Sequence, residues 1–119
     1  MKQSIIGEKS MAFAIRIVRL CQYLTEEKKE FVISKQLLKS GTSIGANTRE
    51  SRNAQSKNDF INKLNIALKE ADETEYWLEL LYRTDYLSET EYLSINKDNS
   101  ELIKILTSII KKLKLTGDN

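Results

Sequence analysis

Histidine and proline are absent from this 119-residue chain, which has one cysteine, Cys21, and four glycines. Without histidine, the usual general base, the commonest metal ligand and every Ser-His or Cys-His catalytic arrangement are excluded. A single cysteine forms no intrachain disulfide, which fits a reducing compartment, and its place among apolar residues indicates a buried small hydrophobe. No apolar run approaches the roughly 18 residues of a membrane span. No signal peptide is recognised, so we expect a cytoplasmic protein.

The residues that are abundant are typical of a helical protein. Leucine, isoleucine, lysine and glutamate dominate, and 40% hydrophobic with 30% charged residues predicts a folded chain rather than a disordered one. The length suffices for one domain, residues 1–119, with one modest core. The net charge of +2 is small, so composition alone indicates no strong attraction to nucleic acid or to an acidic membrane.

Apolar residues spaced by three and four predict two helices in the first half of the chain. After a loose lead-in at residues 1–7, the first helix runs from residue 8 to about residue 24. Thr25 is the expected cap of the second helix, which starts near Lys28. It carries the apolar residues after residue 30 into a central octet at residues 40–47.

In the second half, Ser56 is the expected cap of the most regular helix, with Asp59 three residues later as in a capping box. Ser88 and Glu91 form a second such pair and open a short helix. Residues 96–100 are polar and are expected to break the helix, because short polar side chains compete for backbone hydrogen bonds. A last helix follows over residues 101–115.

The octet at residues 40–47 is rich in glycine, serine and threonine, and by itself it is typical of a loop. Its spacing favours a helix instead, with the packing residues Gly41, Ile44, Gly45 and Thr48 on one face. Two interior glycines each cost about 1 kcal/mol relative to alanine, which close approach of a neighbouring helix would offset. We therefore place the octet inside a helix at a tight crossing.

Four amphipathic helices with short connections predict an all-α fold, an antiparallel four-helix bundle. The apolar stripes of the last two helices are wider than one small bundle needs, and Ile66, Trp77 and Leu80 lie on a second side of the third helix. Self-association is the expected way to bury the surplus.

Three segments carry a resemblance to a known family. QLLKSGTSIGAN (residues 36–47), AQSKNDFINKL (54–64) and IALKEADETEYWLELL (66–81) resemble bacterial four-helix-bundle proteins first noticed in open reading frames inside 23S ribosomal RNA intervening sequences. That family is related to the accessory variability determinant of diversity-generating retroelements. The resemblance implies a helical octet and a ring-shaped homopentamer. It supplies no catalytic residue or cofactor, and the retroelement relative is a basic pentamer that binds reverse transcriptase and nucleic acid.

Basic side chains concentrate around the second helix and the start of the third, and a ring would multiply their charge. Binding of RNA, DNA or a nucleic-acid-processing protein is therefore an alternative to a purely structural role. An ordinary solvated surface would equally explain these basic residues. The candidate contacts are Lys35, Lys39, Arg49, Arg52, Lys57 and Lys63.

Glu70, Asp72, Glu73 and Glu75 invite a third interpretation, a carboxylate-bridged metal centre in a bundle. Such centres use Glu-x-x-His motifs, and this chain has no histidine. We expect no catalytic residue, metal or cofactor. The sequence thus favours a non-enzymatic, self-associating interaction module, with nucleic-acid binding as the alternative and a metalloenzyme as a remote one.

Overall fold

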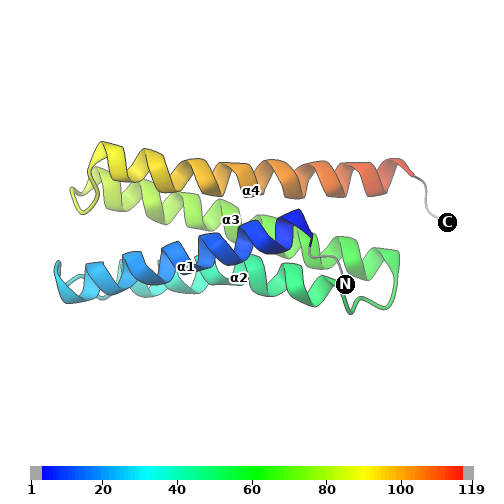
Figure 1. Ribbon diagram of the computed structural model, residues 1–119, viewed down its shortest axis with the longest axis horizontal. Helices are drawn as coiled ribbons and strands as arrows, with labels where there is room; N and C mark the ends of the chain where they lie inside the picture. Colours follow the sequence, from blue (N-terminus) through cyan, green and yellow to red (C-terminus); the bar gives the residue numbers. More distant parts are fainter. Residues whose placement is uncertain (1–3, 117–119) are drawn as a thin grey trace.

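The computed structural model describes residues 4–116, which form four helices and no strand (Figure 1). They are α1 (Ile5–Glu26), α2 (Ile33–Ser51), α3 (Lys57–Arg83) and α4 (Glu89–Leu115). Successive helices run in opposite directions and pack in a four-helix bundle of 51 × 24 × 21 Å. The octet at residues 40–47 is helical throughout, so the expectation of an uninterrupted α2 is confirmed.

The first helix begins earlier than its apolar spacing predicts. The Ser4 hydroxyl accepts a hydrogen bond from the Gly7 N–H at 3.0 Å and caps a helix that starts at Ile5. Ile6 is buried, which ties the first turn to the core. The predicted lead-in is therefore wrong for residues 5–7, while residues 1–3 lie outside the described part of the chain.

The start of α2 is set by a residue that the sequence analysis did not select. The Glu30 carboxylate accepts hydrogen bonds from the N–H groups of Val32, Ile33 and Ser34 at 3.1, 2.9 and 2.7 Å. Thr25 instead donates to the Cys21 carbonyl inside α1, so a cap at Thr25 and a start near residue 28 are both wrong. A carboxylate at a helix N-terminus also interacts favourably with the helix dipole.

Both predicted serine caps of the later helices are present. Ser56 accepts from the Asp59 N–H at 3.0 Å, and Ser88 accepts from the Glu91 N–H at 3.1 Å. The capping box is complete at the second site, where the Glu91 carboxylate accepts the Ser88 N–H. At the first site, the Asp59 carboxylate binds the N–H of residue 55 instead, one position earlier.

The predicted break at residues 96–100 is wrong, because α4 is continuous through it. Asn99 is fully buried and donates from Nδ2 to the Ala71 carbonyl of α3 at 2.9 Å. Asp98 forms an ion pair with Arg16 of α1 at 2.8 Å. These polar side chains bond to neighbouring helices instead of competing for their own backbone, so the helix persists.

The core lies between the four apolar stripes and includes a polar bridge between α2 and α3, where Thr74 donates to Ser40 at 2.9 Å. Its fully enclosed large side chains include Phe13, Ile17, Leu37, Ile44, Leu78 and Leu106. Helix α2 packs along α1 and α3, and α4 packs along α3. A fourth pair, α1 and α4, makes a smaller contact than any of these three.

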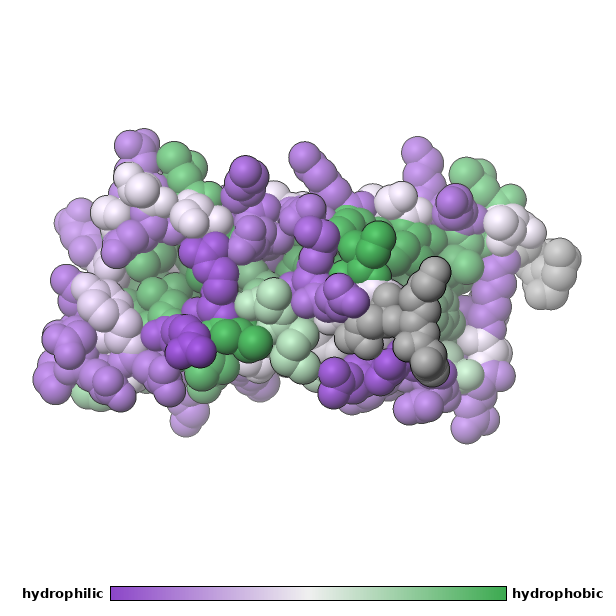
Figure 2. Space-filling view, in the orientation of Figure 1, coloured by the Kyte–Doolittle hydropathy of each residue, from purple (hydrophilic) through white to green (hydrophobic). Residues whose placement is uncertain are grey.

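Polar pairs span the seam between α1 and α4. Lys9 lies 3.2 Å from Glu101, and Arg16 contacts Asp98 and the Ser94 side chain. The space-filling view also shows apolar surface between these two helices in its right half (Figure 2). Along residues 4–116, no helix combines the length and apolar character that crossing a membrane requires.

Candidate functional site

The small-residue face of α2 packs on α1, but the two glycines differ in their surroundings. A Cβ at Gly41 would lie 2.8 and 2.9 Å from the side-chain carbons of Ile17, which is fully buried. A Cβ at Gly45 would meet Ser10 at 3.3–3.5 Å, close to ordinary contact. Close approach therefore requires glycine at position 41 much more than at position 45.

The remaining packing residues, Ile44 and Thr48, are both buried. The Thr48 hydroxyl donates to the Ile44 carbonyl at 2.8 Å, so its polar atom is satisfied within α2. The Ser43 hydroxyl and the Asn47 amide also bond to carbonyls four residues earlier, at 2.6 and 2.8 Å. These polar groups serve the helix itself and offer no arranged ligand set.

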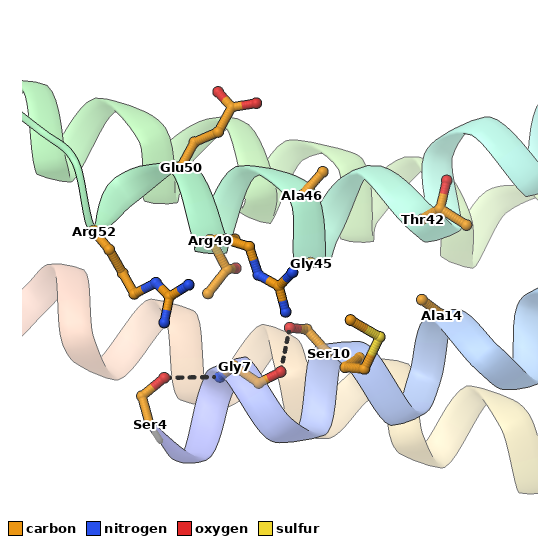
Figure 3. Close-up of a pocket in the computed structure, with 12 residues that line it drawn as sticks. Ser4, Gly7, Ser10, Ala14, Thr42, Gly45, Ala46, Arg49, Glu50 and Arg52 are labelled. Carbon is orange, nitrogen blue, oxygen red and sulfur yellow. Dashed lines mark hydrogen bonds between the residues drawn. The ribbon is translucent and has the colours of Figure 1, made fainter. Parts of the chain in front are cut away.

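Outside this packing face, α1 and α2 enclose a groove of about 440 Å³ (Figure 3). We call it the α1–α2 groove. Small residues form much of its lining, including Gly7 and Ala14 from α1 and Gly45 and Ala46 from α2. Met11, which is 44% exposed, adds an apolar side chain. Because these small residues let α1 and α2 approach closely, few side-chain atoms fill the space between the two helices at the surface.

Two of the predicted basic residues meet at this groove. Figure 3 shows the guanidinium groups of Arg49 and Arg52 pointing from α2 toward α1, while the Glu50 carboxylate points away. Glu50 is paired with Lys63 of α3 at 3.2 Å. Within residues 4–116, neither arginine forms an ion pair. The groove therefore has a cationic end that no carboxylate of the described chain neutralises by contact.

The other four predicted basic residues do not join this pair. Lys63 is engaged with Glu50, and Lys57 donates to Thr116 near the end of α4. Lys35 lines a separate hollow at the other end of α2, and Lys39 lies toward α3, where its charge acts on Glu70. The six candidates thus surround α2 and do not form one continuous patch.

The seam between α1 and α2 continues into an apolar hollow of about 380 Å³. Val18 of α1, Leu38 of α2 and Phe31 before α2 contribute to its lining and are 38%, 39% and 60% exposed. Val18 lies one helical turn beyond Ala14, and Leu38 lies one turn before Thr42, which lines the α1–α2 groove. The groove and this hollow therefore follow one another along the α1–α2 seam, with arginines at one end and mainly apolar side chains, together with Lys35, at the other.

A second surface with mixed character lies on α3. Ile66, Glu70, Glu73, Trp77 and Leu80 are spaced by four and three, so they share a face, and all are at least partly exposed. We call it the α3 outer face. The Trp77 Nε1–H donates to Glu73 at 3.2 Å. Burial and the neighbouring Glu73 charge raise the pKa of Glu70, although Lys39 and Lys69 oppose this.

The carboxylates of the acidic stretch of α3 are spread along the helix and are not gathered into a cluster within residues 4–116. No group of three or more carboxylate or thiol side chains is close enough to hold a metal ion anywhere in the described chain. Asp72 and Glu73 are exposed to solvent. The stretch therefore contributes surface charge to α3.

Cys21 is buried, as predicted from its place among apolar residues. Its Sγ donates to the Ser34 carbonyl at 3.3 Å. Burial, with a smaller contribution from the Glu30 charge, raises the pKa of this thiol from 9.0 to about 11. A protonated, enclosed thiol is a poor nucleophile at neutral pH.

The bundle with its small-residue α2 face can now be compared with known proteins. The sequence matches the family of 23S rRNA-intervening sequence proteins over residues 2–108. This chain belongs to that family. The match includes the whole of α1, α2 and α3 and most of α4. The family identification made from the three sequence segments is confirmed.

A solved structure extends the comparison of this 23S rRNA-intervening sequence family member to three dimensions. A crystal structure of a protein of unknown function from the S23 ribosomal protein family of Bacteroides thetaiotaomicron is 64% identical in sequence. The similarity covers 90% of this chain and 99% of that one, with a TM-score of 0.89. No curated protein matches the sequence. The comparisons fix the fold and bring no activity with them.

Proposed function

We propose that this protein is a non-enzymatic interaction module that associates with itself, as a ring of identical bundles in the cytoplasm. The observation that carries the proposal is the distribution of exposed apolar side chains. Of the eleven large apolar side chains that are exposed within residues 4–116, eight lie on α1 or between residues 31 and 38. Concentrated apolar exposure on one side of a small domain is typical of a protein interface.

The wide apolar stripes of α3 and α4 predict surplus apolar surface on these two helices, but the exposed apolar side chains are distributed differently. Most of the wide stripe on α4, including Ile103, Ile105 and Ile109, is half-buried against the core. The side chains left most exposed are Val32 at 74% and Ile5 at 68% near the ends of α1 and α2, and Leu115 at 78% at the end of α4. Self-association is therefore proposed mainly through α1 and α2.

Sedimentation velocity of the purified chain tests this proposal directly. We expect an oligomer at micromolar concentration, with a mass that is an integral multiple of the 13.7 kDa chain. A concentration series from about 1 to 100 µM separates a stable ring from weak, concentration-dependent association. A stable ring keeps its mass over this range, whereas a weak assembly dissociates as the concentration approaches its Kd. A monomer throughout that range contradicts self-association.

Binding of RNA or DNA is a second candidate function, favoured by a different observation. Lys35, Lys39, Arg49 and Arg52 all lie on or just after α2 and form no ion pair within residues 4–116. Repetition around a ring would multiply their potential. Fluorescence anisotropy with short RNA and DNA should then show affinity that falls steeply as salt rises. Absence of binding in about 20 mM salt, far below the screening range of physiological buffers, ends this candidate.

A further inference from the structure

We infer that the α1–α2 groove receives the α3 outer face of a second copy of this chain. The inference rests on the proposed self-association and names the two surfaces that carry it. The groove is thus assigned to a protein partner and not to nucleic acid.

Charge complementarity is the first argument for this pairing. Arg49 and Arg52 point into the groove and form no ion pair within residues 4–116. Glu70 and Glu73 on the α3 outer face likewise form no ion pair in the described chain. An arginine fork is well suited to bind a carboxylate with two parallel hydrogen bonds. Each surface therefore carries the charge that the other lacks.

The order of charged and apolar groups along the two surfaces supplies the second argument. On α3 the acidic residues are followed, seven residues or about 10 Å further along, by Trp77 and Leu80. Along the α1–α2 seam the arginine end of the groove is followed by Thr42, seven residues or about 10 Å from Arg49, and then by Leu38 in the neighbouring hollow, eleven residues or about 16 Å from Arg49. With Glu70 opposite Arg49, Trp77 therefore comes opposite Thr42 in the small-residue part of the groove, and Leu80 comes opposite Leu38 in the apolar hollow.

This alignment also fixes the relative direction of the two protomers. The apolar residues follow the acids along α3 but precede the arginines along α2, so the partner's α3 runs antiparallel to α2. Within one protomer α3 is also antiparallel to α2. The two bundles therefore point the same way. Neighbours related by rotation about an axis along the bundle close into a ring.

The pairing is head-to-tail, because the groove and the α3 outer face are different surfaces of the same chain. A two-fold dimer would instead place one surface against itself. Small residues in the groove leave room for the Trp77 side chain and for the 60% exposed Tyr76 ring, which packs on it at 5.0 Å between centroids. The lining of small and apolar side chains suits a protein helix more than a phosphate backbone, which favours the second copy.

Charge reversal tests the pairing in solution. One variant carries Arg49→Glu and Arg52→Glu, a second carries Glu70→Arg and Glu73→Arg, and a third carries all four changes. By sedimentation velocity we expect each two-site variant to raise the dissociation constant of the assembly at least about tenfold, because like charges would face each other. The four-site variant should recover most of the loss, since every interface regains opposite charges.

The matched control is Lys104→Glu with Lys111→Glu, which makes the same charge change as the arginine variant on exposed positions of α4. It should leave the assembly unchanged. Circular dichroism and melting of all variants check that the bundle still folds. A mixture of the two different two-site variants should also associate, because each supplies the charge that the other has lost.

The outcomes separate this inference from the proposed function. A wild-type chain that stays monomeric overturns both. An assembled wild type whose association survives both reversals overturns only the pairing, and self-association through other surfaces stands. If the arginine reversal leaves the assembly intact and abolishes RNA binding in the anisotropy assay, the groove belongs to nucleic acid and the pairing is wrong.

Discussion

Gly41 and Gly45 occupy equivalent places in the sequence pattern, but only one of them is sterically required. The side chain of Ile17 fills the space over Gly41, and Ile17 is fully enclosed by the core. Over Gly45 the nearest atoms belong to Ser10, near the exposed groove. Both neighbours are buried, but a methyl group at position 41 would need a large shift of the Ile17 carbons, whereas at position 45 a shift of the Ser10 hydroxyl by a few tenths of an ångström suffices.

We expect Gly41→Ala to lower the free energy of unfolding by about 1–3 kcal/mol through overpacking, despite the better helix propensity of alanine. Gly45→Ala should be close to neutral or stabilising by up to about 1 kcal/mol, since the propensity gain meets little strain. Urea titration of the two variants gives the comparison. Equal effects at both positions would contradict the difference in packing.

The spacing along the chain places Gly41, Ile44, Gly45 and Thr48 on one helical face. It could not predict which glycine is sterically required, because the atom that faces each glycine depends on the register of α1 along α2. Nor could it place Arg49 and Arg52 together at a groove, because that arrangement depends on the first turn of α1 lying beside the last turn of α2. Such information lies in the packing of two helices and not in the spacing within one.

Cys21 gives a second prediction at this scale, on pH dependence. Because its pKa rises from 9.0 to about 11 in the folded protein, the protonated thiol contributes stability that is fully present below about pH 9. That contribution is lost as the pH rises through about 11. Thiol titration with a disulfide reagent should be slow at pH 8 and release one equivalent in denaturant. Rapid reaction of the native protein at pH 8 would show an accessible thiolate.

At the scale of a helix, the start of α2 and the continuity of α4 were harder to predict than the existence of either helix. The capping serines follow local rules, so the starts of α3 and α4 could be read from the chain. Glu30 was missed because the predicted helix starts near Lys28, which places Glu30 inside it, and because its carboxylate acts through three backbone groups. The continuity of α4 was missed because Asn99 bonds to α3, a contact invisible in local sequence.

Substitution of Glu30 by alanine should therefore destabilise the bundle through α2. The change leaves three backbone N–H groups without their carboxylate partner, one of them buried at Ser34. Loss of a helix cap typically costs about 0.5–2 kcal/mol, and we expect the upper part of that range. Glu27→Ala, at an exposed neighbouring position, is the control and should change stability by less than about 0.5 kcal/mol. Thermal and urea unfolding measure both.

For the whole molecule, stripe width proved a poor guide to where apolar surface is left over. Helix α3 has a neighbour on two sides and absorbs a wide stripe, whereas α1 packs mainly on α2 and meets α4 over a short contact. Periodicity reports how much of a helix is apolar, but not how many neighbours cover it. The bundle could be predicted from the sequence. The position of the exposed apolar side of α1 could be seen only once the packing of the four helices was known.

The polar seam between α1 and α4 should contribute little to stability. Arg16 pairs with Asp98 at 2.8 Å, but both side chains are more than 40% exposed, so solvent screens the pair. We expect Arg16→Met to lower the free energy of unfolding by less than about 1 kcal/mol, with the difference shrinking in 0.5 M salt. Urea titrations at two salt concentrations test this. A larger, salt-independent loss would indicate that Arg16 fixes the seam by packing.

The hydroxyl groups of α2 have a consequence for how its sequence can drift. Thr42, Ser43 and Thr48 donate to carbonyls of their own helix, so none of them forms a directional bond that holds α1 in place. Saturation mutagenesis across residues 40–48 should consequently tolerate exchanges among serine, threonine and alanine at these three sites while rejecting almost every change at Gly41. On the side of α2 that faces α1, one steric contact at Gly41, rather than a set of hydrogen bonds, therefore limits the allowed substitutions.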